Sequence, residues 1–184
     1  ASPLLGNPQG LAVFMDGTKV NESFGDTLRW DMIPQNAIST INLIPGSNPA
    51  YGLNSLGGVL SLTTKSGFQN PGSEVSLSGG SWGRKNLQFE HGASNGSNDL
   101  FFAGSLFEED GWRDASSSNV KQFFVKVGSE SEDADIDVSF TWADTYLDGT
   151  QALPVSFLDN PEQAYTFPDT NENELAFLNL DWKR

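Results

Sequence analysis

The feature that most constrains the fold is a series of segments in which apolar and polar residues alternate, beginning after about residue 72. Val75 and Leu77 alternate with polar neighbours, and Ile136–Trp142 alternates over its whole length. Successive side chains of a β-strand point to opposite faces, so this period of two predicts strands with one apolar and one polar face. The other predicted strands are 86–90, 100–107, 120–127 and 175–182. The segment 100–107 is apolar on both faces, so its orientation stays open.

The connections between these strands alternate in length. NGSN (95–98) and ESED (130–133) predict tight hairpin turns, whereas 108–119 and 147–170 predict long polar loops. One end of the sheet therefore has short turns and the other has long loops, apart from the short 81–84 link. Such an arrangement is typical of a transmembrane β-barrel. A soluble antiparallel sandwich has strands of the same alternation, so the pattern alone leaves both open.

The first part of the chain, up to about Gly67, predicts shorter elements. Leu11–Met15 reads as a strand that ends at the turn dipeptide Asp16-Gly17, and Pro34 is placed to open a helical turn through Ile38. Strands follow at 39–44 and 59–64. The sequence thus predicts a small α+β unit before the alternating segments.

Two adjacent glycines, Gly57 and Gly58, stand directly before the last of these strands. A phosphate-binding loop requires a lysine immediately after its second glycine, but Lys65 lies at the far end of the strand. We therefore expect a tight backbone turn at which glycine permits positive φ or the close approach of another segment.

Composition excludes several classes of function. Lys and Arg number 10 against 24 Asp and Glu, a net charge of -14 that argues against a nucleic-acid partner. The absence of cysteine excludes disulfides, thiol nucleophiles and thiolate metal sites. No run approaches the ~20 apolar residues of a spanning helix. No signal peptide is visible, so we expect either a cytoplasmic chain or one whose beginning has been removed.

Candidate chemical sites are weak. Asp133, Asp135 and Asp137 resemble the start of a calcium loop, but Val138 and Asp144 replace its glycine and glutamate. Glu108, Glu109 and Asp110 are adjacent and do not establish the separated carboxylates of a glycosidase. The lone His91 makes a poor metal ligand. We therefore predict no catalytic residue, no metal site and no cofactor.

Larger side chains near the predicted loop end suggest other roles. Trp82, Trp112 and Trp142 fall near predicted strand ends, where an indole can keep its ring in apolar surroundings and its N–H in water, as in an interfacial girdle; core packing is the alternative. Arg84 and Arg113 stand at the predicted loop end, where a guanidinium can meet an anionic ligand.

Three pieces of the first part together resemble the plug domain of TonB-dependent receptors of bacterial outer membranes. They are VFMDG (13–17), the stretch 33–41 with its following strand, and PGSNPAYGLNSLGGVLSLTTKSG (45–67). The resemblance implies the C-terminal part of a plug domain at 1–67, a linker at 68–72 and about six strands of an N-terminal barrel portion at 73–184. The expected fold class is mainly β, a small α+β plug unit followed by antiparallel strands of an incomplete transmembrane β-barrel.

The resemblance also implies a function. In this family the plug blocks a large barrel, and energy delivered by TonB rearranges it to admit a bound nutrient. We therefore expect a receptor and not an enzyme, in the outer membrane of a Gram-negative bacterium, with a small-molecule or metal-chelate ligand such as an iron-siderophore. Its expected partners are TonB, through a segment absent from this chain, and outer-membrane lipid.

Family members contact their ligand from the outward loop of the plug, which here follows Asp16-Gly17. The resemblance makes the ligand-binding candidates Ser23, Phe24, Gly25, Asp26, Arg29 and Trp30. Phe24 stands where a related ferrichrome-type receptor carries an aromatic contact. The alternative is that Phe24 and Trp30 only pack the plug against the barrel wall.

Departures from the family define what the chain is expected to be. No TonB-contact segment precedes Ala1, and about six strands are too few to close a barrel, which needs at least ~8. We expect an internal piece of a longer receptor. The rival interpretation is a secreted or surface β-sandwich that binds carbohydrate through exposed tryptophans, and a third is a glycoside hydrolase that uses Glu108 or Glu109. Iron-siderophore, cobalamin, nickel chelate and oligosaccharide all remain open as cargo.

Overall fold

The computed structural model describes residues 10–22, 27–46, 51–52, 55, 57–149, 152–166 and 169–184. Within them the chain forms a small mixed sheet followed by a six-stranded antiparallel sheet, and its helical parts are short 3₁₀ turns. This is the mainly β architecture expected from the sequence. In the described ranges, no helical segment has the length and apolar character needed to cross a membrane.

The small sheet has the strand order β2-β1-β4-β3. Its strands are β1 (Leu11–Met15), β2 (Thr18–Lys19), β3 (Ile38–Pro45) and β4 (Gly58–Thr64). β1 pairs in parallel with β4, and the other two pairings are antiparallel. Asp16 and Gly17 have φ of 46° and 80°, as a two-residue hairpin turn requires. The predicted turn between β1 and β2 is therefore confirmed.

The glycine pair before β4 serves close backbone approach. At Gly58, where φ is 127°, a Cβ would lie 2.7 Å from the carbonyl oxygen of Ile44 on β3. The Gly57 amide donates a hydrogen bond to the Gly10 carbonyl oxygen at 2.8 Å, and a Cβ there would lie 3.1 Å from that oxygen. The expectation drawn from the sequence is confirmed, because a side chain at either position would meet neighbouring backbone.

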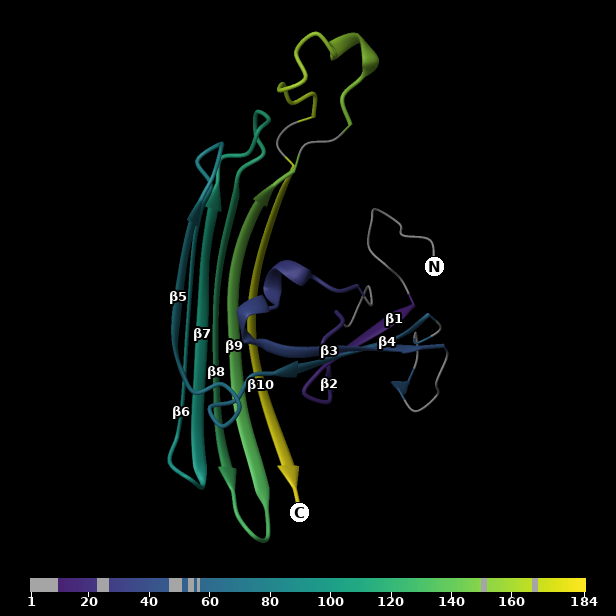
Figure 1. The fold of residues 1–184 in the computed structure, drawn as a ribbon. Helices are drawn as coiled ribbons and strands as arrows, with labels where there is room; N and C mark the ends of the chain where they lie inside the picture. The colour runs from purple at the N-terminus through teal and green to yellow at the C-terminus, as the bar shows by residue number, and fades with distance from the viewer. Residues whose placement is uncertain are drawn as a thin grey trace.

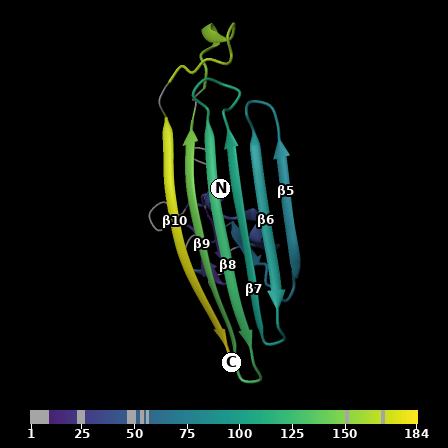
Figure 2. The same cartoon turned by 90° about the vertical axis from the view of Figure 1, so that its left-hand side faces the viewer.

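The large sheet is a meander in which each strand pairs with the next (Figures 1 and 2). Its strands are β5 (Gly72–Gly79), β6 (Lys85–Ser94), β7 (Asn98–Glu109), β8 (Ser118–Glu130), β9 (Asp135–Asp148) and β10 (Thr170–Lys183). The connections 95–97 and 131–134 form one end, here called the turn end. The connections 80–84, 110–117 and 149–169 form the loop end, and the last contains η4 (Val155–Phe157). Both predicted hairpins and both predicted long connections are present.

The large sheet curves around the small one, so it has a concave inner face and a convex outer face (Figure 1). Apolar side chains are exposed on the outer face: Val75, Leu77, Leu106, Val127, Val138, Leu178 and Leu180. Polar side chains are buried on the inner face: Ser105, Gln122, Lys126, Ser139, Thr141 and Thr145. This polarity is the reverse of a soluble sandwich, which buries its apolar face.

Two apolar clusters join the sheets. The first consists of Val13, Met15, Leu28, Ile33 and Leu62, with Phe177 of β10 packed against it. In the second, Ala37 of η2 (Gln35–Ala37) contacts the inner face of β7 and β8 at Phe101, Ala103 and Phe124. Phe101 and Ala103 therefore point inward and Leu100 and Leu106 outward, which resolves the orientation of the segment that is apolar on both faces.

Candidate functional site

Of the six residues predicted to contact a ligand, Ser23, Phe24, Gly25 and Asp26 lie outside the described residues. Arg29 directly precedes η1 (Trp30–Met32), which lies on the side of the small sheet nearer the loop end (Figure 1). Although Arg29 and Trp30 are neighbours in the chain, they line two different cavities. The structure therefore does not bring these two side chains into one site.

Arg29 forms an ion pair beside the first cavity. Its Nε donates to Glu22 Oε1 at 2.6 Å, and Thr27 Oγ1 donates to Glu22 Oε2 at 2.9 Å. The hydrogen bond from Arg29, followed by that from Thr27, lowers the pKa of Glu22 below its ordinary value of 4.5. The cavity measures about 300 Å³ and is lined largely by apolar side chains, including Met15 and Phe177. The charge of Arg29 is thus already compensated within the chain.

Trp30 lines the second cavity, which measures about 290 Å³. The small-sheet side contributes Trp30, Asp31 and Gln35, and strands β6 to β8 contribute Asn86, Gln88, Ser105, Phe107, Val120 and Gln122. Its lining is aromatic and polar but mostly uncharged, since Asp31 is the one charged residue among the described residues that line it.

Two side-chain amides anchor the small unit to the inner face. Asn36 of η2 donates from Nδ2 to the carbonyl oxygens of Phe89 (3.2 Å) and Gly104 (2.9 Å), which lie opposite each other on β6 and β7. Gln122 of β8 donates from Nε2 to the carbonyl oxygens of Asp31 (2.6 Å) and Ile33 (3.2 Å). Sequence reasoning missed both, because nothing in the local pattern indicates which amide meets a distant backbone.

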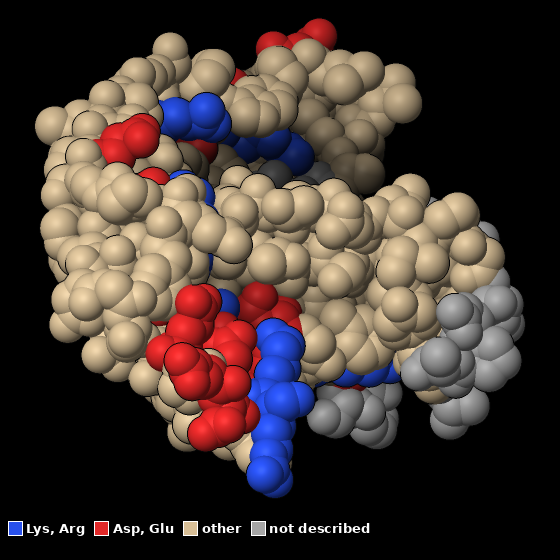
Figure 3. Space-filling view, turned by 60° about the horizontal axis from the view of Figure 1, so that its bottom comes forward, with Lys and Arg blue, Asp and Glu red and all other residues tan. Residues whose placement is uncertain are grey.

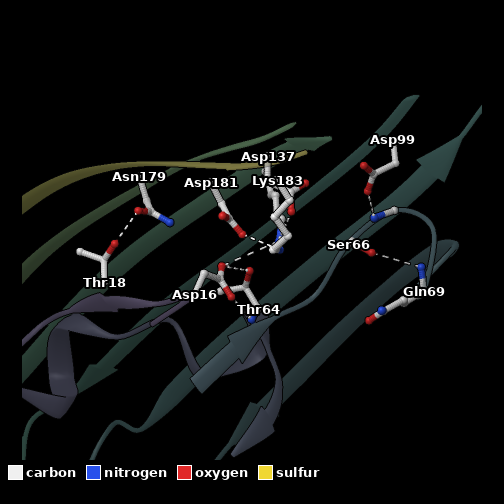
Figure 4. Close-up of polar contacts among 12 residues, drawn as sticks. Asp16, Thr18, Thr64, Ser66, Gln69, Asp99, Asp137, Asn179, Asp181 and Lys183 are labelled. Carbon is white, nitrogen blue, oxygen red and sulfur yellow. Dashed lines mark hydrogen bonds and ion pairs between the residues drawn. The ribbon is translucent and has the colours of Figure 1, made fainter. Parts of the chain in front are cut away.

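Charged pairs also join the two sheets, closer to the turn end. Asp16 accepts hydrogen bonds from the amide and the hydroxyl of Thr64, at 2.9 and 2.5 Å (Figure 4). Lys126 of β8, whose side chain is 8% exposed, lies 3.8 Å from Asp16 Oδ2 and 3.2 Å from Asp137 Oδ2. Lys65 pairs with Glu90 of β6 at 2.7 and 2.8 Å. The signal available in the sequence was the placement of Lys126 and Asp137 on the polar sides of their strands.

The contacts of Lys126 with Asp16 and Asp137 border a cavity of about 520 Å³ at the turn end. It is rich in carboxylates: Asp16, Asp99, Glu130, Asp135, Asp137 and Asp181 line it, together with Lys126 and Lys183. Figure 3 shows acidic side chains gathered beside basic ones on this end of the molecule. Lys183 pairs with Asp181 at 2.6 Å, so part of this charge is also compensated internally.

Acidic residues that the sequence analysis considered as candidate sites form ion pairs with basic side chains. Glu108 and Glu109 are successive residues of β7, so they point to opposite faces and do not form an opposed carboxylate pair. Glu108 lies 3.5 Å from Lys85, and Glu109 lies 3.0 Å from Arg84. Asp137, from the calcium-like run, pairs with Lys126 on the inner face.

Two of the three tryptophans that were expected near strand ends lie at the loop end, and the third does not. Trp82 and Trp112 lie exposed in the connections at the loop end, but β9 continues to Asp148, so Trp142 lies in the middle of its strand. The prediction that Trp142 stands near a strand end was therefore wrong. Arg84 pairs with Glu109, and Arg113 donates to the carbonyl oxygen of Gln163 at 2.9 Å.

Comparison with known proteins gives a consistent result at the level of fold. No family model and no curated protein sequence matches the chain. The siderophore receptor PiuA from Acinetobacter baumannii matches 92% of the chain with a TM-score of 0.70 and 14% identity. FpvA of P. aeruginosa, solved with heterologous pyoverdines, matches 93% with a TM-score of 0.68 and 13% identity. Over the matched residues the chain has the fold of the corresponding part of TonB-dependent receptors.

The copper transporter OprC is a further match, over 74% of the chain with a TM-score of 0.62 and 20% identity. The chain spans about a quarter of these solved structures, namely 26% of PiuA, 25% of FpvA and 23% of OprC. The resemblance drawn from the sequence is confirmed at this level. The matched proteins include siderophore receptors and a copper transporter.

Proposed function

We propose that this chain is part of an outer-membrane receptor of a Gram-negative bacterium. The receptor binds a scarce solute, an iron-siderophore or a similar metal chelate, and imports it into the periplasm when TonB moves the plug. In this proposal residues 1–67 are the C-terminal part of the plug, 68–72 a linker and 73–184 the N-terminal portion of the barrel.

The observation that carries the proposal is the reversed polarity of the large sheet. Its outer face exposes a band of aliphatic side chains, as a wall that faces lipid requires, while its inner face buries hydroxyls, amides and a lysine against the small sheet. A small sheet held against the polar inside of a curved wall has the geometry of a plug.

The ligand-binding residues in this proposal are Ser23, Phe24, Gly25, Asp26, Arg29 and Trp30. The position of η1 on the side of the small sheet nearer the loop end supports the last two, because a ligand that arrives from outside the cell meets that side first. The partners in this proposal are outer-membrane lipid, which contacts the outer face, and TonB.

The test uses the full-length gene product in a Gram-negative strain that lacks its own chelate receptors. Uptake of a panel of radioactively labelled iron, copper and cobalt chelates is measured with TonB intact and with TonB deleted. Uptake of at least one chelate that requires both the protein and TonB supports the proposal. Equal uptake with and without TonB for every chelate contradicts it.

A further inference from the structure

The cavity beside Trp30 has a charge pattern that restricts what can bind in it. Asp31 is the one charged residue among the described residues that line it. Its Oδ2 is buried and accepts no hydrogen bond from the described residues, whereas its backbone carbonyl oxygen accepts one from Gln122. A buried carboxylate oxygen without a donor is costly, so a rotation of the Asp31 carboxylate toward the cavity would let a ligand supply the donor.

Basic groups near the cavity are already engaged. Arg84, whose guanidinium lies 5.8 Å from the ring of the lining residue Phe107, is held by both carboxylate oxygens of Glu109 at 3.0 and 3.1 Å. Arg29, in the neighbouring cavity, is held by Glu22. An anionic group entering beside Trp30 would therefore meet a carboxylate and no uncommitted cation from these two arginines.

The uncharged part of the cavity lining suits a neutral or positively charged ligand. Trp30 is 40% exposed and lines the cavity together with Phe107, and both rings can cover the alkyl segments of a ligand or attract a cationic group. Asn86, Gln88 and Ser105 provide amide and hydroxyl groups that can bind donors and acceptors alike.

We propose that this cavity is a subsite for a hydrogen-bond-donating, neutral or positively charged part of the cargo, with Asp31 as its acceptor. The cargo is accordingly a neutral or cationic metal chelate, such as a ferric trihydroxamate that carries a free ammonium group, and not a polyanionic one such as a ferric tricatecholate. This inference rests on the proposed function, because it assigns the cargo class of the same plug surface.

The test measures binding of these two ferric chelates to the purified full-length receptor, and their TonB-dependent uptake into cells. The trihydroxamate is expected to bind more tightly than the tricatecholate. Asp31→Asn keeps the shape but removes the charge, and should weaken trihydroxamate binding about tenfold or more. Asp31→Lys should invert the preference.

Asp144→Asn is the matched control, because Asp144 pairs with Lys121 and does not line the cavity. It should leave both affinities unchanged. The inference is overturned if the unchanged receptor binds the tricatecholate more tightly, or if Asp31→Asn leaves the affinity for the trihydroxamate unchanged. In either case, TonB-dependent uptake of a chelate would still support the proposed function. Failure of the whole chelate panel to show TonB-dependent uptake overturns both.

Discussion

The two sheets of this molecule bury opposite kinds of side chain. The small sheet has an apolar core of Val13, Met15 and Leu62, as a water-soluble protein has. The large sheet exposes its aliphatic side chains and buries Thr141 and Thr145. Both sheets are built from strands with an apolar and a polar side or from short apolar strands. Which side is buried therefore depends on the medium that each face contacts, and not on the sequence pattern of the strands.

The largest expected effect is a loss of stability when a charge is placed in the core of the small sheet and not on its surface. Leu62 is 1% exposed, and Leu62→Asp should lower the free energy of unfolding of the small sheet by about 4 kcal/mol or more, because it buries a carboxylate among aliphatic groups. Limited proteolysis of the full-length receptor measures the loss. Leu43→Asp, at an exposed position of β3, is the control and should leave the cleavage rate unchanged. Equal protection of the two variants would show that Leu62 has no core role.

The second prediction concerns the buried ion pair between the sheets. Lys126→Met leaves the carboxylates of Asp16 and Asp137 without their cation and should cost about 3 kcal/mol of unfolding free energy. Urea unfolding of the receptor in detergent measures it. Lys121→Met removes an exposed pair with Asp144 and should cost less than about 1 kcal/mol. Similar small losses in both variants would mean that burial adds nothing to the inner pair.

A third substitution tests the outer face of the large sheet. Val138→Lys places a charge where lipid is proposed and should cost about 2 kcal/mol of the free energy of folding into vesicles. Denaturant titration in lipid vesicles gives this value, and Val138→Leu should behave like the unchanged protein. A stable Val138→Lys variant would indicate that this face meets water.

The smallest effect concerns the ion pair beside η1. Because hydrogen bonds from Arg29 and Thr27 depress the pKa of Glu22, the stabilisation is present above pH 4.5 and is lost as the pH falls through the lower, folded-state pKa. The pair is well exposed, so the change should be under about 1 kcal/mol. Proteolysis near Arg29 should accelerate at acidic pH, and Glu22→Gln should remove this dependence. An identical pH profile in both proteins would rule out the role of Glu22.

Much of the fold was predictable, because local rules determine it. Alternation gave the strands of the large sheet, and Asp16-Gly17 and the pair Gly57-Gly58 gave two turns whose backbone tolerates few other residues. What alternation does not give is which face is buried. That assignment required the resemblance of residues 13–67 to a plug domain.

The candidate site was less predictable, because its contacts join residues far apart in the chain. Arg29 and Trp30 look like one surface in the sequence, yet the 3₁₀ turn that begins at Trp30 sends them to different cavities. The backbone carbonyl oxygen of Asp31 accepts from Gln122, 91 residues away, and both residues line the same cavity. No periodicity within a strand carries such information.

The amide anchors of Asn36 and Gln122 have an evolutionary consequence. Each amide donates to main-chain carbonyl oxygens, which every amino acid supplies. Substitution of the side chains of Asp31, Ile33 or Phe89 therefore does not remove the acceptors of these hydrogen bonds. The pairing of Asp16 with Lys126 has no such freedom, because one member can change safely only when the other changes with it. Among diverging relatives, residues at the amide contacts should therefore vary independently, whereas residues at the positions of Asp16 and Lys126 should change together.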